Sequence, residues 1–398
     1  MVRAPTKTAV CRVRFRDVAR LCTDRCADPA AEGMERYVGL EHLEPGDLRI
    51  RKWGLVADGT TFTNRFRPGQ VLFGKRRAYQ RKVAVADFAG VCSGDIYVLE
   101  PANGSLVPEL LPFLCQTDAF FEHAIGTSAG SLSPRTNWRS LGDFEFALPP
   151  LDEQRSIVHL LRAVESVLEA RRKVTIHATA LLRSGIDAMF EAGVAVDGGQ
   201  SQPGEPSNRW IPTELSAVTN KIVDGVHKRP DYVDSGVPFL TVENLTSGPD
   251  IEFSITRFIT QSDHQEFSKR ANPERGDVLV SKDGTLGVAR VIEADVPFSI
   301  FVSVALLKPK RELVDPWFLR YFFDSKVFCS RLASKTSGSA LKHIHLVDFR
   351  STIIPLPPLH LQRRIVSTLR SLDRAARRAS GAIIEAERLK KCILGTLR

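Results

Sequence analysis

The chain has 398 residues, which is more than one hydrophobic core usually supports, so two globular units are expected. Its hydrophobic content of 43% is that of a folded soluble protein, and no run of about 18 uncharged apolar residues occurs that would form a membrane-spanning helix. The net charge of +9 favours nucleic acid as a polyanionic partner over a membrane, with a basic surface that meets only solvent as the alternative.

The N-terminal segment and the cysteines indicate a cytoplasmic protein. Residues 1–7 lack the apolar region of a signal peptide. The seven cysteines are an odd number and lie far apart, which suits free thiols in a reducing compartment. Only Cys22 and Cys26 lie close together, and a single Cys-x3-Cys pair is a weak zinc signal. We therefore expect no metal site.

The first part of the chain, from Val13 to about Phe146, alternates short strand-like and helix-like segments. Residues 71–73 and 96–99 are rich in β-branched and aromatic side chains, which predicts strands. Residues 109–121 predict a helix with its proline near the first turn. An α/β or α+β unit of ordinary size follows.

The segment from Leu148 onward is a long helical pattern. Two prolines are followed by Asp152 and Glu153, whose negative charge suits the N-terminus of a helix. Apolar side chains then recur at spacings of four and three, which indicates a helix that packs on another helix, and the stripe begins with Ile157, Leu161, Val164 and Leu168. The helix could run about 40 residues, or ~60 Å.

The second half of the chain repeats this order. Residues 195–207 are rich in Gly, Ser, Gln and Pro, which is typical of a linker. A second globular unit follows from Trp210 to about Ile354, with predicted strands at 278–280 and 302–307 and a predicted helix that begins with residues 316–323. A final helical segment runs from residue 359 to residue 398.

The two long helical segments are duplicates at a fixed offset of 208 residues. Leu-Pro-Pro-Leu and the following Gln-Arg-x-Ile-Val occur at residues 148–158 and again at 356–366. The second stripe keeps the coiled-coil period over about five heptads, through Ile365, Leu369, Leu372, Ala376, Ala379, Ile383, Ala386, Lys390, Ile393 and Leu397. The first stripe has the same register, interrupted at Arg171. Because each helix alone would expose its stripe to water, we expect the two to pack together as a coiled coil.

The duplication extends into the globular units. Three islands match between the halves: residues 37–43 with 239–245, 68–75 with 275–282, and 127–131 with 336–339. Between these islands the halves diverge, so the domains share a scaffold and differ where a binding surface would lie.

The sequence offers no catalytic motif. It has no Gly-rich phosphate loop, no dinucleotide fingerprint and no Asn-Pro-Pro-aromatic tetrapeptide. His343 and His345 lack an evident third metal ligand, so polar loop residues are the favoured interpretation. Asp277 and Lys282 lack the second acid of a nuclease core. We expect no catalytic residue and no metal.

Basic loops are the stronger candidates for function. Residues 75–82 place five cations and a tyrosine directly after a strand, which is the composition of a loop that contacts phosphates and base edges. Residues 226–230 and 281–285 could serve similarly, although charged turns are often only solvated. The predicted DNA-contacting residues are Lys75, Arg76, Arg77, Tyr79, Thr127, Ser128, His227, Lys228, Arg229, Lys282, Thr336, Ser337 and Lys342.

The duplicated proline-led helices, each closing a domain with a Gly-x-Val-Leu strand and a Thr-Ser-rich loop, resemble the specificity subunit of type I restriction-modification enzymes. The resemblance covers nearly the whole chain. It implies an α+β fold with two similar target recognition domains related by a pseudo-twofold axis, separated by two long helices in an antiparallel coiled coil. The implied limits are 1–147 and 209–354 for the domains, 148–192 and 355–398 for the spacer helices, and 193–208 for the linker.

The resemblance also implies a function without catalysis in this chain. The partners would be double-stranded DNA, two modification subunits that bind S-adenosylmethionine and methylate adenine, and restriction subunits for cleavage, with no cofactor here and no membrane. The expected partner-binding residues are Leu151, Gln154, Ile157, Leu359, Gln362 and Ile365. A rigid spacer between two different readers predicts two different half-sites with an unread gap. A self-contained enzyme on nucleic acid and a coiled-coil scaffold for protein partners are the alternatives.

Overall fold

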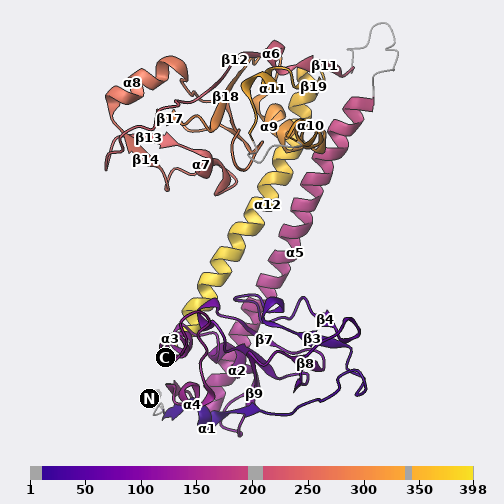
Figure 1. Ribbon diagram of the computed structural model, residues 1–398, viewed down its shortest axis with the longest axis vertical. Helices are drawn as coiled ribbons and strands as arrows, with labels where there is room; N and C mark the ends of the chain where they lie inside the picture. Colours follow the sequence, from indigo (N-terminus) through magenta and orange to yellow (C-terminus); the bar gives the residue numbers. More distant parts are fainter. Residues whose placement is uncertain (1–10, 196–208, 337–342, 398) are drawn as a thin grey trace, which may run out of the picture. The chain divides into compact units, whose positions relative to one another are not determined.

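The computed structural model describes residues 11–195, 209–336 and 343–397. The chain divides into two compact units, unit 1 with residues 1–172 and 380–398, and unit 2 with residues 173–379. Two long helices, α5 (Leu151–Ala195) and α12 (Leu359–Leu394), each contribute one part to unit 1 and the other part to unit 2 (Figure 1).

Unit 1 contains two four-stranded sheets and a strand pair. The orders are β2-β9-β6-β7, which is antiparallel throughout, and β4-β3-β8-β5, in which β3 and β8 are parallel. Strands β1 and β10 pair beside them. The bounds are β1 Cys11–Arg14, α1 Phe15–Val18, β2 Ala19–Cys22, β3 Arg36–Val38, β4 Gly54–Leu55, β5 Asn64–Phe66, β6 Val71–Gly74, β7 Val83–Val85, β8 Gly90–Cys92, β9 Ile96–Pro101, α2 Leu111–Leu114, α3 Asp118–Gly126, α4 Trp138–Gly142 and β10 Glu145–Leu148.

Unit 2 repeats this topology. Its sheets have the orders β12-β18-β15-β16 and β14-β13-β17, and β11 pairs with β19. The bounds are β11 Ile211–Glu214, α6 Leu215–Val218, β12 Thr219–Asp224, β13 Val237–Leu240, α7 Val242–Thr246, β14 Arg257–Ile259, α8 Gln261–Arg270, β15 Val278–Ser281, β16 Ala289–Val291, β17 Ser299–Ile300, β18 Val304–Pro309, α9 Pro316–Asp324, α10 Lys326–Thr336, α11 Leu346–Arg350 and β19 Ile353–Leu356. The duplication in sequence is therefore a duplication of fold.

Most predicted elements lie where the sequence places them. The last helix, expected over 359–398, ends at Leu394, and two other elements differ more. The strand expected at 302–307 begins only at Val304, because its N–H closes a turn on the carbonyl of Phe301. The helix expected at 109–121 is divided into α2 and α3. Thr117 ends one helix and caps the next: its hydroxyl bonds the carbonyl of Leu114 at 2.9 Å and accepts the N–H of Phe120 at 3.3 Å.

The long helices pack against each other within each unit, in opposite directions. In unit 1, Glu165 of α5 lies 2.6 Å from Lys390 of α12. Farther along α5, Arg172 lies 3.6 Å from Glu387, which precedes Lys390 on α12, so the two helices run antiparallel. In unit 2, the late part of α5 shares a hydrophobic cluster with the early part of α12. The predicted stripe on α12 has no exposed member, and Arg171 is the exposed member of the stripe on α5. The paired helices of the predicted fold class are confirmed.

The motif glutamine that follows the first proline pair joins α5 to its own domain. Gln154 is 1% exposed, and its side chain makes three hydrogen bonds. Its carbonyl oxygen accepts the N–H of Val107 at 2.8 Å, while its amide nitrogen donates to the carbonyls of Ser105 at 2.9 Å and Pro149 at 2.8 Å. The start of the helix is thus fixed to the loop after β9.

The second motif glutamine repeats these contacts in unit 2. Gln362 is fully buried, accepts the N–H of Asp315 at 2.9 Å, and donates to Leu313 at 2.9 Å and Pro357 at 2.8 Å. All three partners lie 208 residues after their counterparts in unit 1. The motif is therefore a structural joint in each half.

Removing this joint should destabilise unit 1. The substitution Gln154→Ala leaves one buried N–H and two buried carbonyls without partners, and each such group costs roughly 1–3 kcal/mol. We expect a lower urea midpoint of unfolding for Gln154→Ala, measured by circular dichroism. Glu153→Ala, one residue earlier on the exposed face, is the matched control. Equal midpoints for the two variants would contradict the joint.

Candidate nucleic-acid interface

The basic loop of unit 1 follows β6 and is built onto its neighbours through Lys75. The N–H of Lys75 donates to the carbonyl of Asp95 at 3.0 Å, and its carbonyl accepts the N–H of Thr136 at 3.0 Å. Its ammonium lies 4.7 Å from the ring centre of Tyr97. Lys75 is half-buried, so its position is set by the fold and not by solvent.

The tip of this loop presents an aromatic side chain to solvent. Ala78–Gln80 form a single 3₁₀ turn flanked by Arg77 and Arg81, which have φ angles of 53° and 56°. Left-handed backbone at residues other than glycine is uncommon and tends to occur at functional sites. The N–H of Arg77 donates to the carbonyl of Pro134 at 2.7 Å, and this hydrogen bond helps to hold the left-handed conformation of Arg77. Tyr79 on this turn is 54% exposed.

The arginines of the loop are tied to the segment after α3. Asp95 accepts from Arg76 at 3.2 Å and from Arg135 at 2.7 Å. Burial opposes ionisation of Asp95, but these hydrogen bonds outweigh it and lower the pKa of its carboxyl. Arg76 and Arg77 both donate to the hydroxyl of Ser133, at 3.1 and 3.4 Å. The basic loop and the Thr-Ser-rich loop therefore form one surface.

The two predicted hydroxyls of the Thr-Ser-rich loop are used within that loop. Thr127 donates to the carbonyl of His123 at 2.8 Å, and Ser128 donates to that of Ala124 at 2.7 Å. These bonds satisfy carbonyls at the end of α3. The structure thus brings Thr127 and Ser128 beside the basic loop, where they shape its support.

The corresponding lysine of unit 2 is buried. Lys282 is 3% exposed, and its ammonium lies 3.0 Å from the carboxylate of Asp224. Asp224 also binds Arg270 and lies 3.5 Å from His227. Burial opposes ionisation of Asp224, but Arg270 and Lys282 outweigh it and lower the pKa of its carboxyl. This burial argues against the predicted phosphate contact of Lys282, because its charge is already neutralised inside the unit.

A run of exposed cations in unit 2 lies in the segment after β12. His227, Lys228 and Arg229 are all exposed, and the Arg229 guanidinium lies 5.7 Å from the ring centre of Tyr232. Arg257 of β14 lies 4.8 Å from the same ring. These side chains form one accessible basic surface of the second unit.

The remaining predicted contacts of unit 2 are at the edge of the described chain. Ser337 and Lys342 lie outside the described residues, and of Thr336 only its place at the end of α10 is described. His343 forms an ion pair with Asp283 and its ring meets that of His345 at 4.6 Å. In the described segments no group of three or more His, Cys, Asp or Glu side chains is placed to hold a metal ion.

Two cations of these surfaces were not singled out from the sequence. Arg135 reaches the basic loop of unit 1 from a segment about 60 residues later, through its bond to Asp95. Arg257 comes from a strand that pairs with β13. Each is a single arginine in a mixed segment, so no local signal marks it. Asp277, in turn, is buried and bound to Lys308 at 2.7 Å, apart from the Lys282 pair.

The six predicted partner-binding residues differ in accessibility. The side chains of Gln154 and Gln362 are buried and form hydrogen bonds within the chain. Ile157 is 9% exposed, and Ile365 packs on the core of unit 2. Leu359 is half-buried, and Leu151 is 38% exposed. Contacts with a partner subunit at these positions stay a prediction. In the described part of the chain every helix is too short or too polar to span a lipid bilayer.

Comparison with known proteins agrees with this duplicated architecture. A model of the type I restriction modification DNA specificity domain matches residues 44–178 and 226–387. The specificity subunit of the Escherichia coli type I restriction enzyme EcoBI is 22% identical over 305 residues, which are 69% of this chain and 64% of that protein. The MjaVIII specificity subunit of Methanocaldococcus jannaschii is 22% identical over 386 residues, or 93% of this chain and 86% of that one.

Solved structures show the same fold. The type I restriction-modification S subunit from M. genitalium has a TM-score of 0.58 at 15% identity, over 99% of this chain and 97% of that one. A chain from a structure on complex assembly and conformational transition of the type I R-M system has a TM-score of 0.56 at 23% identity, over 99% and 98%. Because the specificity-domain model matches both units, the chain belongs to the type I restriction-modification specificity subunits, the non-catalytic DNA specificity subunits of these systems.

Proposed function

We propose that this chain reads an asymmetric, bipartite site on double-stranded DNA and recruits two modification subunits, together with restriction subunits, to it. The observation that carries the proposal is a shared scaffold with different reading surfaces. The sheets β2-β9-β6-β7 and β12-β18-β15-β16 have the same strand order, yet unit 1 exposes Tyr79 beside Lys75, whereas unit 2 buries Lys282 and exposes His227, Lys228 and Arg229. Different side chains in the grooves read different bases, so the half-sites should differ.

The chemistry belongs to the partners in this proposal. S-adenosylmethionine would bind to the modification subunits, which methylate adenine, and this chain would hold no cofactor of its own. Its work would take place in the cytoplasm, where the seven cysteines can stay reduced, and would involve no membrane. Its contribution would be sequence choice and the positioning of the partners on DNA.

Co-expression tests this division of labour. We expect the chain expressed with its modification subunit to produce one methylated adenine motif, bipartite and asymmetric, when host DNA is mapped for methylation. The chain alone and the modification subunit alone should each leave the motif unmodified. Methylation by the chain alone, or a symmetric uninterrupted motif, would contradict the proposal.

Substitutions of Lys228 and Lys282 in unit 2 should separate DNA contact from stability. Lys228→Ala should reduce the slope of log affinity against log salt by about 1, because each lost phosphate contact releases one counterion fewer. Its melting temperature should stay that of the parent chain. Lys282→Ala should instead lower the melting temperature, since it leaves Asp224 buried beside one partner fewer. A salt slope that changes with Lys282 and not with Lys228 would reverse these assignments.

The length of the helices should set the unread gap. Inserting seven residues into α5 and the matching seven into α12 keeps the seam in register and adds ~10 Å, about three base pairs. We expect methylation mapping to show both half-sites unchanged and the gap lengthened. A change within a half-site would show that the helices take part in reading, and not only in spacing.

A further inference from the structure

Each unit contains one surface of the paired helices on which a recognition domain rests. We call them seat 1, residues 151–172 and 380–397, and seat 2, residues 173–195 and 359–379. Domain 1 (residues 11–148) rests on seat 1, and domain 2 (residues 211–356) rests on seat 2. The two seats are duplicates, which raises the question of what keeps each domain on its own.

The apolar contacts and the glutamine joints do not distinguish the seats. Leu161 packs in the core of unit 1 as Leu369 does in that of unit 2, and the residue pairs 157/365 and 158/366 are identical in type. Gln154 and Gln362 bind two equivalent backbone groups in their domains. Discrimination between the domains must therefore come from other contacts.

The first ion pair between domain and seat has opposite polarity in the two units. On seat 1, Glu169 of α5 binds Arg51 at 2.5 Å and Arg49 at 3.6 Å, both from the loop before β4. The position 208 residues later on seat 2 is Arg377, which binds Asp250 at 2.5 Å from the corresponding loop of domain 2. The seat is thus acidic at this position in unit 1 and basic in unit 2.

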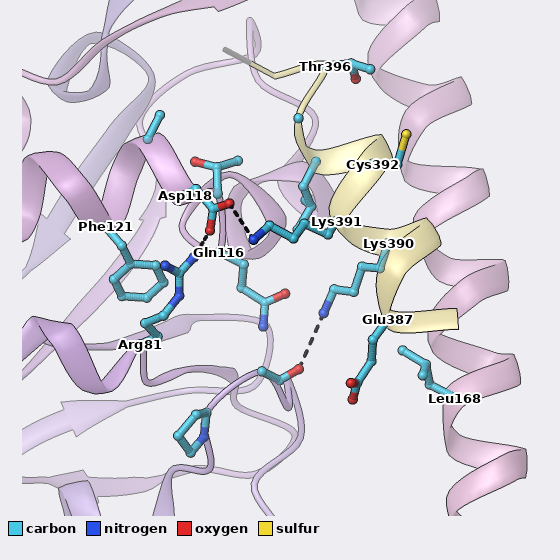
Figure 2. Close-up of a pocket in the computed structure, with 16 residues that line it drawn as sticks. Arg81, Gln116, Asp118, Phe121, Leu168, Glu387, Lys390, Lys391, Cys392 and Thr396 are labelled. Atoms are coloured by element: carbon cyan, nitrogen blue, oxygen red, sulfur yellow. Dashed lines mark hydrogen bonds and ion pairs between the residues drawn. The ribbon is translucent and has the colours of Figure 1, made fainter. Parts of the chain in front are cut away.

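In the second ion pair the domain residue changes sign between the units. Asp118, the first residue of α3, binds Lys391 of seat 1 at 3.1 Å and also Arg81 of its own domain (Figure 2). The corresponding first residue of α10 is Lys326, which lies 3.3 Å from Asp187 of seat 2. Lys391 and the counterpart of Asp187, residue 395, are one helical turn apart. Seat 2 keeps a cation, Arg183, at the position of Lys391, and adds the acid Asp187 where seat 1 has Gly395.

The source of a third, buried cation also differs. On seat 1, Lys390 is 7% exposed and reaches Glu165 at 2.6 Å. It also donates to the carbonyl of Gly46 at 3.4 Å, a hydrogen bond drawn as a dashed line from Lys390 in Figure 2. In unit 2 the equivalent carbonyl, that of Gly248, receives Arg290 of domain 2 at 2.7 Å. Seat 2 has Leu182 at the position of Lys390. Seat 1 thus brings its own cation, while domain 2 carries one.

We propose that the charges of each seat are complementary to those of one recognition domain only, so that each seat accepts one kind of domain. We call this charge pattern the address of the seat. Seat 1 accepts a domain whose first loop places Arg49 and Arg51 at Glu169, beside the acid Asp47 that binds Arg172, and whose second α-helix after β9 begins with an acid. Seat 2 accepts the reverse. Domain 1 on seat 2 would bring Arg51 against Arg377, while Asp118 would meet Asp187 as well as Arg183, the residue at the position of Lys391. Domain 2 on seat 1 would bring Asp250 against Glu169 and Lys326 against Lys391. An exposed ion pair adds little attraction, but like charges in its place select against the wrong partner.

A domain exchange in the full chain tests this address. In the first chimera, residues 11–148 are replaced by a copy of 211–356, which places domain 2 on seat 1. The second chimera adds Glu169→Arg and Gly395→Asp, which give seat 1 the charges of seat 2. A third adds Glu169→Gln and Gly395→Asn as the uncharged control. At residue 395 a β-carbon would lie 3.2 Å from the carbonyl of Cys392, a small cost that the second and third chimeras share.

Differential scanning calorimetry reads out the result. We expect the first chimera to melt at least ~5 °C below the parent chain, and the second to recover at least half of that loss. The uncharged third chimera should recover less than the second. The address is refuted if the first chimera has the melting temperature of the parent chain. It is also refuted if the second chimera recovers no more melting temperature than the third.

Charge reversal in the unaltered chain supplies an independent measurement. Asp118→Lys and Lys391→Asp should each lower the melting temperature of unit 1. The double variant should lose less melting temperature than the sum of the two single losses, because the reversed charges can pair again. The exposed pair of Glu385 and Arg388, 2.9 Å apart within α12, is the matched control, and reversing it should change nothing. If the loss of melting temperature in the double variant equals the sum of the two single losses, the pair between Asp118 and Lys391 does not contribute to the address.

Discussion

The fixed angle between each recognition domain and its helix depends on one buried amide. A glutamine side chain carries an acceptor and two donors in one plane, and Gln154 and Gln362 use them to join the helix start to the loop that follows the domain's longest sheet strand. An unsatisfied amide at these buried positions would be costly, so the joint has one favourable geometry. The proline pair before it stops the preceding strand and lets the helix begin.

The same joint occurs twice, and everything attached to it can then diverge. The apolar faces that follow it are near duplicates, and they bury each helix against its domain without regard to which domain it is. Charge supplies what the apolar surface cannot, because two methyl groups attract in any pairing whereas two charges attract in only one. The inverted pairs at Glu169 and Arg377, and at Asp118 and Lys326, are therefore the part of the scaffold that carries identity.

The sequence is a good guide to the scaffold because its signals are periodic. The stripes on α5 and α12, the strands that begin at Val71 and Val278, and the shared offset of 208 residues all follow from spacing, and the described residues agree with them. The division of the expected helix at 109–121 has no periodic signal, because it depends on the side chain of Thr117 alone. The hydroxyl of Thr117 caps α3 within a segment whose composition is helical throughout. Periodicity predicts how elements pack and not where one side chain ends them.

The reading surfaces are harder to predict because accessibility depends on distant partners. Lys75 and Lys282 follow equivalent strands, so sequence alone gives them the same role. The difference lies in Asp224, 58 residues before Lys282, which draws that lysine into the unit, whereas Lys75 lies over the ring of Tyr97 and stays half-buried. A charge already paired in a low-dielectric interior gains little from a phosphate, since its desolvation has been offset within the fold. The exposed cations of unit 2 that follow β12 are therefore the accessible ones near this strand, and a single acid in a neighbouring strand accounts for the difference between Lys75 and Lys282.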